Sequence, residues 1–130
     1  MSAALLLLML AFEDPPKDVV DFFRSVAVEL SEAHDNGSGR AFLDDFDKSM
    51  PGYAALSDQI EAMVAGGEVS ANIDFVNTEG DDQKRTLDLD WLLQCEGQGP
   101  KRQVIKCTIE KRGKKWKITS VAPVEFFKRD

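Results

Sequence analysis

Two aspartates stand in the segment RTLDLDWLLQC, residues 85–95, where they alternate with large apolar side chains. A pair of carboxyl groups can work as general acid and general base when burial or a neighbouring charge raises the pKa of one of them. Here the period of two predicts a strand instead, with Asp88 and Asp90 on the face opposite Trp91 and the leucines. Amide and lysine side chains share that face, so we interpret the aspartates as the solvated side of a sheet.

Three further side chains could do acid–base chemistry. Asp47 borders an apolar helical stripe, Tyr53 is the only tyrosine and His34 is the only histidine. Each also has a purely structural interpretation. His34 interacts favourably with the end of a helix, Asp47 is exposed, and Tyr53 packs with its hydroxyl group in water. A catalytic site built from these three residues is therefore a hypothesis, and the sequence alone favours a protein without catalytic activity.

Metal and cofactor sites are not indicated by the sequence. One histidine and two cysteines give no ligand spacing typical of zinc. The acidic run DDFDKS lacks the glycine and the distal glutamate of a calcium loop, and no glycine-rich phosphate loop occurs. We predict that the domain uses neither a metal ion nor a cofactor.

Composition and charge indicate one globular domain that does not bind nucleic acid. The chain has 130 residues, 43% hydrophobic and 30% charged, with a net charge of −7 that repels phosphate backbones and anionic lipid. The one basic run, KRGKKWK at residues 111–117, is typical of a hairpin kept soluble by lysines.

The N-terminal segment AALLLLMLAF is too short to span a bilayer as a helix. It is similar to the apolar core of a secretory signal but has no positive region before it. We expect residues 1–14 to be a signal-like segment or an extra helix with a linker, and residues 15–130 to form a single domain. An exported, periplasmic location and a cytoplasmic one both stay open, and no stable membrane span is expected in the mature domain.

The chain divides into a helical half and a strand half. Apolar residues at helical spacing predict three helices, around residues 19–33, 42–50 and 56–64. Asn36-Gly37 and Gly66-Gly67 are stop signals for two of them. From residue 68 the period becomes two and predicts four strands, at residues 68–77, 85–95, 103–111 and 114–122. The predicted fold class is α+β, with three N-terminal helices packed on a curved antiparallel sheet.

A strand pairing can be proposed from the loops. It places Phe75 opposite Leu87, Cys95 opposite Gln103, and Ile109 opposite Trp116 across a two-residue turn at Arg112-Gly113. The large apolar residues then face inward together with Ser120, while the outer face keeps four apolar interruptions, Val76, Leu92, Val104 and Val121. The same pairing keeps Cys95 and Cys107 on the order of 13 Å apart along the sheet, which predicts two free thiols.

The order of elements, with the strand QVIKCTIEK and the closing KKWKITSV, resembles the nuclear transport factor 2-like (SnoaL-like) superfamily. FLDDFDKSMPGYAAL also looks like the passage between the second and third helices in small bacterial members. The resemblance covers roughly residues 15–127 and implies a cone-shaped, cystatin-like roll with a cavity between the first helix and the sheet. Members include ketosteroid isomerase, scytalone dehydratase, polyketide cyclases and transport adaptors. The inward strand positions carry no carboxylate, histidine or tyrosine, so no catalytic residue is carried over.

These observations favour a non-catalytic domain that binds a small molecule or another protein. An apolar ligand inside the cone would contact residues of both layers: Phe22, Val26, Phe46, Leu89, Trp91, Cys107 and Trp116. One alternative is a small cofactor-free isomerase, dehydratase or cyclase, and another is an exported interaction module. A homodimer through the outer sheet face and a monomer both stay open. Whether the cone is hollow or filled by its own aromatic side chains also stays open.

Overall fold

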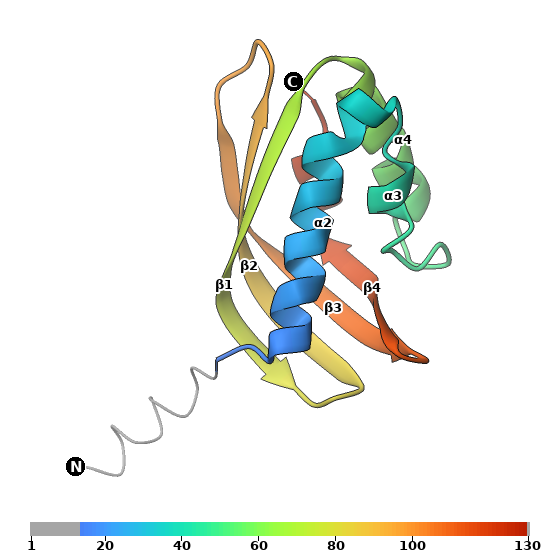
Figure 1. Cartoon of the computed structure of the whole chain (residues 1–130), viewed down its shortest axis with the longest axis vertical. Helices are drawn as coiled ribbons and strands as arrows, with labels where there is room; N and C mark the ends of the chain where they lie inside the picture. The colour runs from blue at the N-terminus through green and yellow to red at the C-terminus, as the bar shows by residue number, and fades with distance from the viewer. Residues whose placement is uncertain (1–13, 130) are drawn as a thin grey trace, which may run out of the picture.

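The computed structural model describes residues 14–129, in which helices pack on one side of a bent antiparallel sheet (Figure 1). In chain order the elements are α2 (Lys17–Asn36), α3 (Arg40–Leu43), α4 (Tyr53–Ala65), β1 (Val69–Gly80), β2 (Lys84–Cys95), β3 (Lys101–Arg112), β4 (Lys115–Ala122) and the 3-10 helix η1 (Val124–Phe127). The sheet order is β1-β2-β3-β4. This confirms the predicted α+β class. The signal-like segment lies outside the described residues.

Helix α2 is long and amphipathic, and it crosses the concave side of the sheet. It buries a stripe of apolar side chains: Val19, Phe23, Val26, Leu30 and Ala33. The helix ends at Gly37, whose φ of 75° lies in the left-handed region and whose N–H donates to the carbonyl of His34 over 3.0 Å. Glycine has no Cβ to oppose that conformation, so the predicted stop at Asn36-Gly37 is confirmed.

The second helix is shorter than predicted, because it stops at Leu43 rather than continuing toward Met50. The backbone that follows also pairs with β4. Ile118 N–H donates to the carbonyl of Asp45, and Asp47 N–H donates to the carbonyl of Ile118, both over 2.8 Å. This exchange covers the edge of β4 with the turn after α3.

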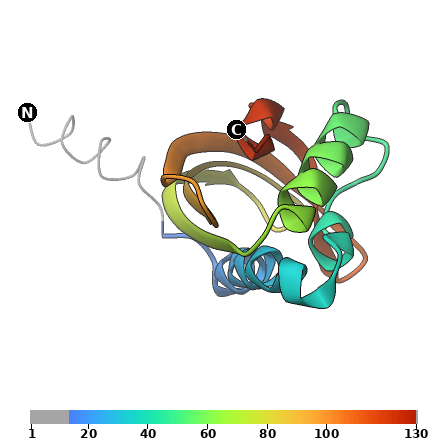
Figure 2. The same ribbon diagram turned by 90° about the horizontal axis from the view of Figure 1, so that it is seen from above.

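The interior of the cone is filled by aromatic rings. Figure 2 shows the sheet curving around one side while the helices close the other. Trp91, which is 0% exposed, packs edge-on against Phe42 and Phe127, with ring centroids 6.4 and 5.1 Å away. Phe46 lies 5.0 Å from Phe42. Phe127 comes from η1, an element that the sequence did not predict, and it closes the cone from the C-terminal end.

The predicted strand pairs are wrong, although most side chains lie on the predicted face. Phe75 pairs with Leu89 rather than Leu87, and Gln103 pairs with Trp91 rather than Cys95. The shifts are two and four residues, and a shift by an even number leaves every side chain on the same face. The β1–β2 turn is tighter than assumed, because Asp81 Oδ1 accepts hydrogen bonds from the N–H groups of Gln83 and Lys84.

The last hairpin also differs from the prediction. Trp116 pairs with Lys111, so the two-residue turn is Gly113-Lys114. An irregularity in the pairing at Thr108 and Ile109 then reverses the faces of the residues that follow on β4. Val121, predicted to be outside, is 6% exposed and belongs to the core, whereas Ser120 is exposed.

Trp91→Ala is expected to cost about 3–5 kcal/mol in the free energy of unfolding, because it removes the ring at the centre of the core. Val104→Ala, at a side chain 52% exposed on the outer face, should change it by less than about 0.5 kcal/mol. Urea denaturation followed by circular dichroism measures both. A cost for Trp91→Ala below about 1 kcal/mol would mean that the interior is not packed around this ring.

Cys95 and Cys107 are both free, as predicted, with Cys107 buried and Cys95 partly exposed. Burial raises the pKa of the Cys107 thiol to about 12, which keeps it protonated and unreactive. Titration with a thiol reagent should therefore detect one reactive cysteine in the native protein and two in denaturant. Two fast-reacting thiols in the native protein would contradict the burial of Cys107.

Candidate functional site

The seven residues predicted to contact a ligand are mostly enclosed in the core. Five of them, Val26, Phe46, Leu89, Trp91 and Cys107, are 0% exposed, and Trp116 is 6% exposed. Phe22 is partly buried and packs against Phe23 with a centroid distance of 5.0 Å. These side chains contact one another and the aromatic rings of the interior. Phe22 and Trp116 also line a cavity of about 370 Å³ next to α2.

The three candidate catalytic residues lie apart. His34 Nδ1 donates to the carbonyl of Val64 over 2.7 Å and so ties the end of α2 to the end of α4. Tyr53 begins α4, on the order of 16 Å away along that helix. Asp47 lies at the turn beside β4, where its carboxylate contacts Arg112 over 2.8 Å. The structure does not bring the three into one site.

Asp47 is held as a permanent anion. The hydroxyl group of Ser49 donates to Oδ1 over 2.6 Å, and the N–H of the same residue donates over 2.8 Å. These bonds and the Arg112 guanidinium lower the pKa of Asp47 to about 2. A carboxylate whose lone pairs are engaged in this way is a weak base, which favours a structural role.

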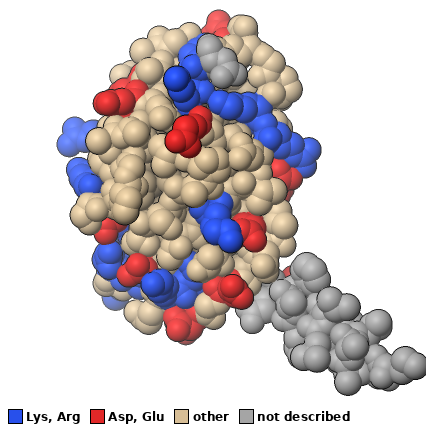
Figure 3. Space-filling view, turned by 180° about the vertical axis from the view of Figure 1, so that it is seen from behind, with Lys and Arg blue, Asp and Glu red and all other residues tan. Residues whose placement is uncertain are grey.

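Asp88 and Asp90 lie on the outer face of the sheet, as predicted. Figure 3 views the molecule from behind and shows opposite charges in contact among uncharged side chains. Asp90 pairs with Arg102 over 2.5 Å, and its pKa is lowered chiefly by this hydrogen bond. Asp88 lies 4.0 Å from Lys106. Two apolar side chains on the same face, Val76 and Val104, are 50% and 52% exposed.

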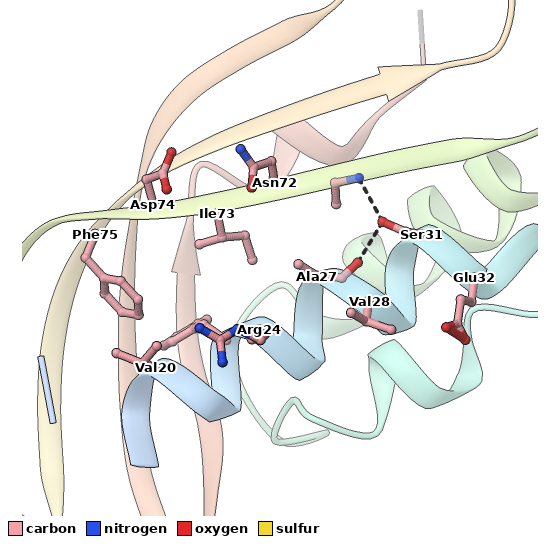
Figure 4. Close-up of a pocket in the computed structure, with 12 residues that line it drawn as sticks. Val20, Arg24, Ala27, Val28, Ser31, Glu32, Asn72, Ile73, Asp74 and Phe75 are labelled. Carbon is pink, nitrogen blue, oxygen red and sulfur yellow. Dashed lines mark hydrogen bonds between the residues drawn. The ribbon is translucent and has the colours of Figure 1, made fainter. Parts of the chain in front are cut away.

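A groove of about 600 Å³ runs between α2 and β1 (Figure 4). Its walls combine helix and strand side chains: Val20, Phe23, Arg24, Ala27, Val28, Ser31 and Glu32 from α2, and Ala71, Asn72, Ile73, Asp74 and Phe75 from β1. Figure 4 shows Ile73 and Phe75 on the side of β1 that faces the helix, opposite Val20 and Ala27. Val28 is 47% exposed on the helix side. The groove is therefore apolar inside and polar along its rim.

The floor of this groove is an open strand edge. Within the four-stranded sheet, β1 pairs only with β2. The N–H of Ala71 points away from β2, because it donates to Ser31 Oγ over 3.0 Å, and Ser31 Oγ in turn donates to the carbonyl of Ala27 over 2.8 Å. Antiparallel pairing alternates, so the backbone groups of Ile73 and Phe75 also point to the groove side. One edge of the sheet is covered by the turn after α3, while the other presents backbone groups next to apolar side chains.

Carboxylates gather at the end of the groove where β1 begins. Glu32 lines the groove. Beyond it, Glu68 lies close enough to Asp35 and Glu96 for their charges to affect it. The pKa of Glu68 is raised, first by its hydrogen bond with Asp35, then by burial and by the charges of Asp35 and Glu96. The charge of His34 acts in the opposite direction. Such crowding of negative charge attracts a cation.

A second cluster of acidic side chains lies on the other side of α2. Glu29 of α2 and Asp45 of the turn after α3 line a cavity of about 560 Å³ together with lysines of β4. The pKa of Asp45 is raised to about 8, first by burial and then by its hydrogen bond with Glu29 and the charge of that residue. The sequence reasoning missed this pair, although Glu29 borders the core stripe and Asp45 precedes the buried Phe46.

Two kinds of site have no candidate in the described part of the chain. Among residues 14–129, no three or more His, Cys, Asp or Glu side chains are grouped so that they could hold a metal ion. No helix in the same range is long and apolar enough to cross a membrane.

No protein-family model and no curated protein matches the sequence. Solved structures do match. A Nostoc punctiforme domain of unknown function with a cystatin-like fold aligns with a TM-score of 0.58 and 15% identity, over 83% of this chain and 76% of that one. A nuclear transport factor 2-like protein with a cystatin-like fold from Novosphingobium aromaticivorans aligns with a TM-score of 0.53 and 14% identity, over 92% and 84%. The fold is nuclear transport factor 2-like.

This nuclear transport factor 2-like fold also occurs as part of a longer chain. Bd1075 of Bdellovibrio bacteriovorus aligns with a TM-score of 0.67 and 10% identity, over 81% of this chain but only 38% of its own. The present chain therefore spans well under half of that protein. Identities at this level establish the fold and leave the function to the residues.

The double substitution Asp88→Asn with Asp90→Asn is expected to leave the fold intact and to change the free energy of unfolding by less than about 1 kcal/mol. The reason is that both ion pairs lie on the solvated outer face, where water and salt screen them. Chemical denaturation at neutral pH measures the change. A loss above about 2 kcal/mol would mean that these carboxylates hold the sheet together.

Proposed function

We propose that this domain is a non-catalytic protein-interaction module that binds an extended segment of a partner polypeptide in the groove between α2 and β1. The segment adds a strand to the open edge of β1. The single observation that carries this proposal is that, within residues 14–129, no strand pairs with the groove side of β1, which lies beside an apolar wall where Ile73 and Phe75 face α2 (Figure 4).

The filled cone supports this choice over a small-molecule site in the interior. The rings of Phe42, Trp91 and Phe127 pack against one another in the core, with centroids 6.4, 6.2 and 5.1 Å apart. Acid–base residues lie outside this cluster. A ligand of any size therefore has better access to the groove, which is open and measures about 600 Å³.

Charge supports a particular kind of partner. Glu32 stands on the rim, and Asp35, Glu68 and Glu96 follow at the end of the groove where β1 begins. An antiparallel added strand ends there with its C-terminal residues, since β1 starts there. The preferred segment carries apolar side chains at alternate positions and lysine or arginine at its C-terminal end.

Strand addition can be tested with a synthetic peptide of about eight residues that alternates valine with threonine and ends in two lysines. Titration into isotope-labelled protein should shift amide resonances of residues 20–32 and 71–75. Val28→Asp, at a side chain 47% exposed in the groove, should weaken binding about tenfold or more, because it places an uncompensated charge against the peptide. A matched peptide that ends in two glutamates should bind more weakly.

The matched control variant is Val104→Asp, at a side chain 52% exposed on the outer sheet face, which should leave the affinity unchanged. Resonance shifts that map to the outer face, equal affinities of the two peptides, or no shifts at about millimolar peptide would each contradict the proposal.

A further inference from the structure

Glu29 of α2 and Asp45 of the turn after α3 line the same cavity, and their side chains lie within hydrogen-bonding reach of each other. Glu29 Oε1 and Asp45 Oδ2 are buried, and neither accepts a hydrogen bond from the described residues. Two carboxyl groups this close repel each other when both are ionised, and each of these two buried oxygens lacks a hydrogen bond. A single proton held between the two groups removes both costs, because the protonated carboxyl donates to the ionised one.

Three of the cations around the pair have other partners. Lys117 Nζ donates to the carbonyl of Asp44 over 2.6 Å, and Lys111 lies 3.4 Å from Asp18 and covers the Trp116 ring at 4.9 Å. Arg112 pairs with Asp47 and with Glu110, over 2.8 and 3.5 Å. Lys48 and Lys115 line the cavity, and Lys114 lines the adjoining one. Lys117 favours ionisation of Asp45, whereas Asp44, Glu29 and burial oppose it.

The turn that carries Asp45 joins the helices to the sheet. Its carbonyl accepts the N–H of Ile118 over 2.8 Å. The next residue, Phe46, is 0% exposed and packs on Phe42 in the filled interior. Whatever holds Asp45 against α2 therefore also holds the edge of β4 in place.

We propose that Glu29 and Asp45 form a proton-operated clasp: one shared proton holds the turn after α3 against α2, and loss of that proton loosens the turn from the helix. The clasp lies on the side of α2 opposite the groove. It does not rest on the proposed peptide binding, and either can fail without the other.

The direction of the pH dependence follows from the pKa of Asp45, which the fold raises from its ordinary value of 3.8 to about 8. In the unfolded chain the group loses its proton near its ordinary pKa, while the folded protein retains it. The stabilisation is therefore complete below about pH 4 and is lost progressively as the pH rises toward about 8.

Pulse-labelling hydrogen exchange of the amides of Phe46, Asp47 and Ile118 reports directly on the turn, since all three donate to backbone carbonyls there. Between about pH 6 and about pH 9.5 their protection factors should fall roughly tenfold or more, relative to amides in the centre of β2. The carboxyl carbon of Asp45 should titrate in the same range by ¹³C nuclear magnetic resonance.

Two variants and one control make the test specific. Glu29→Gln supplies an amide donor to an ionised Asp45, and Asp45→Asn supplies one to an ionised Glu29, so each should hold the turn closed and abolish the loss of protection. The control variant Asp44→Asn changes the exposed neighbouring carboxylate and should still show the loss of protection at high pH. Titration of Asp45 near pH 4, or the same loss of protection in both amide variants as in the wild type, would overturn the clasp.

Discussion

Packing around the Trp91 ring is the constraint on which the rest of the structure depends. The ring lies on β2, near the middle of the sheet, and contacts Phe42 of α3 and Phe127 of η1 edge-on. Its Nε1–H has no partner within the described residues. An unsatisfied buried donor costs about 1–3 kcal/mol, so the ring is retained for its volume and shape rather than for a polar contact. These ring contacts occupy the centre of the core, which supports our proposal of a binding site outside it.

Helix α2 is the element that divides the outside into separate surfaces. Its core stripe contains Phe23 and Val26, its groove stripe contains Arg24 and Val28, and a third stripe carries Glu29 toward α3. Helix α2 thus covers the core and forms one wall of the groove beside β1. It also lies next to the turn that covers the edge of β4. Ser31 shows how closely these roles meet, because its hydroxyl group accepts the N–H of Ala71 at the end of the groove.

The sequence predicted the faces of the strands better than their partners. Alternation places Leu87, Leu89 and Trp91 inward whatever strand lies beside them, and a pairing shifted by two or four residues preserves this pattern. The shifts come from local geometry that alternation does not encode, such as the bulge at Val76 and the tight turn at Asp81. Val121 lies on the unexpected face for the same reason, because an irregularity precedes it.

The candidate sites were harder to predict, because they depend on contacts between distant segments. Asp47 had the spacing expected of a residue near the core, but the structure holds it as a partly exposed anion next to Arg112. Asp45, two positions earlier, is the partly buried carboxyl, because the turn pairs with Ile118 and so brings Asp45 next to Glu29 of α2. The groove likewise depends on the tertiary structure, because it forms where β1 is the edge strand of the sheet and α2 lies beside it.

The central claim is that the protein's own aromatic rings fill the cone and exclude ligands from it. X-ray diffraction from crystals pressurised with xenon tests this most directly, since xenon enters empty apolar cavities in proteins without needing polar contacts. We expect no xenon atom among the rings of Phe42, Trp91 and Phe127, and any bound xenon should lie in the groove between α2 and β1. An ordered xenon atom next to Trp91 inside the cone would contradict the account and restore the interior as the binding site.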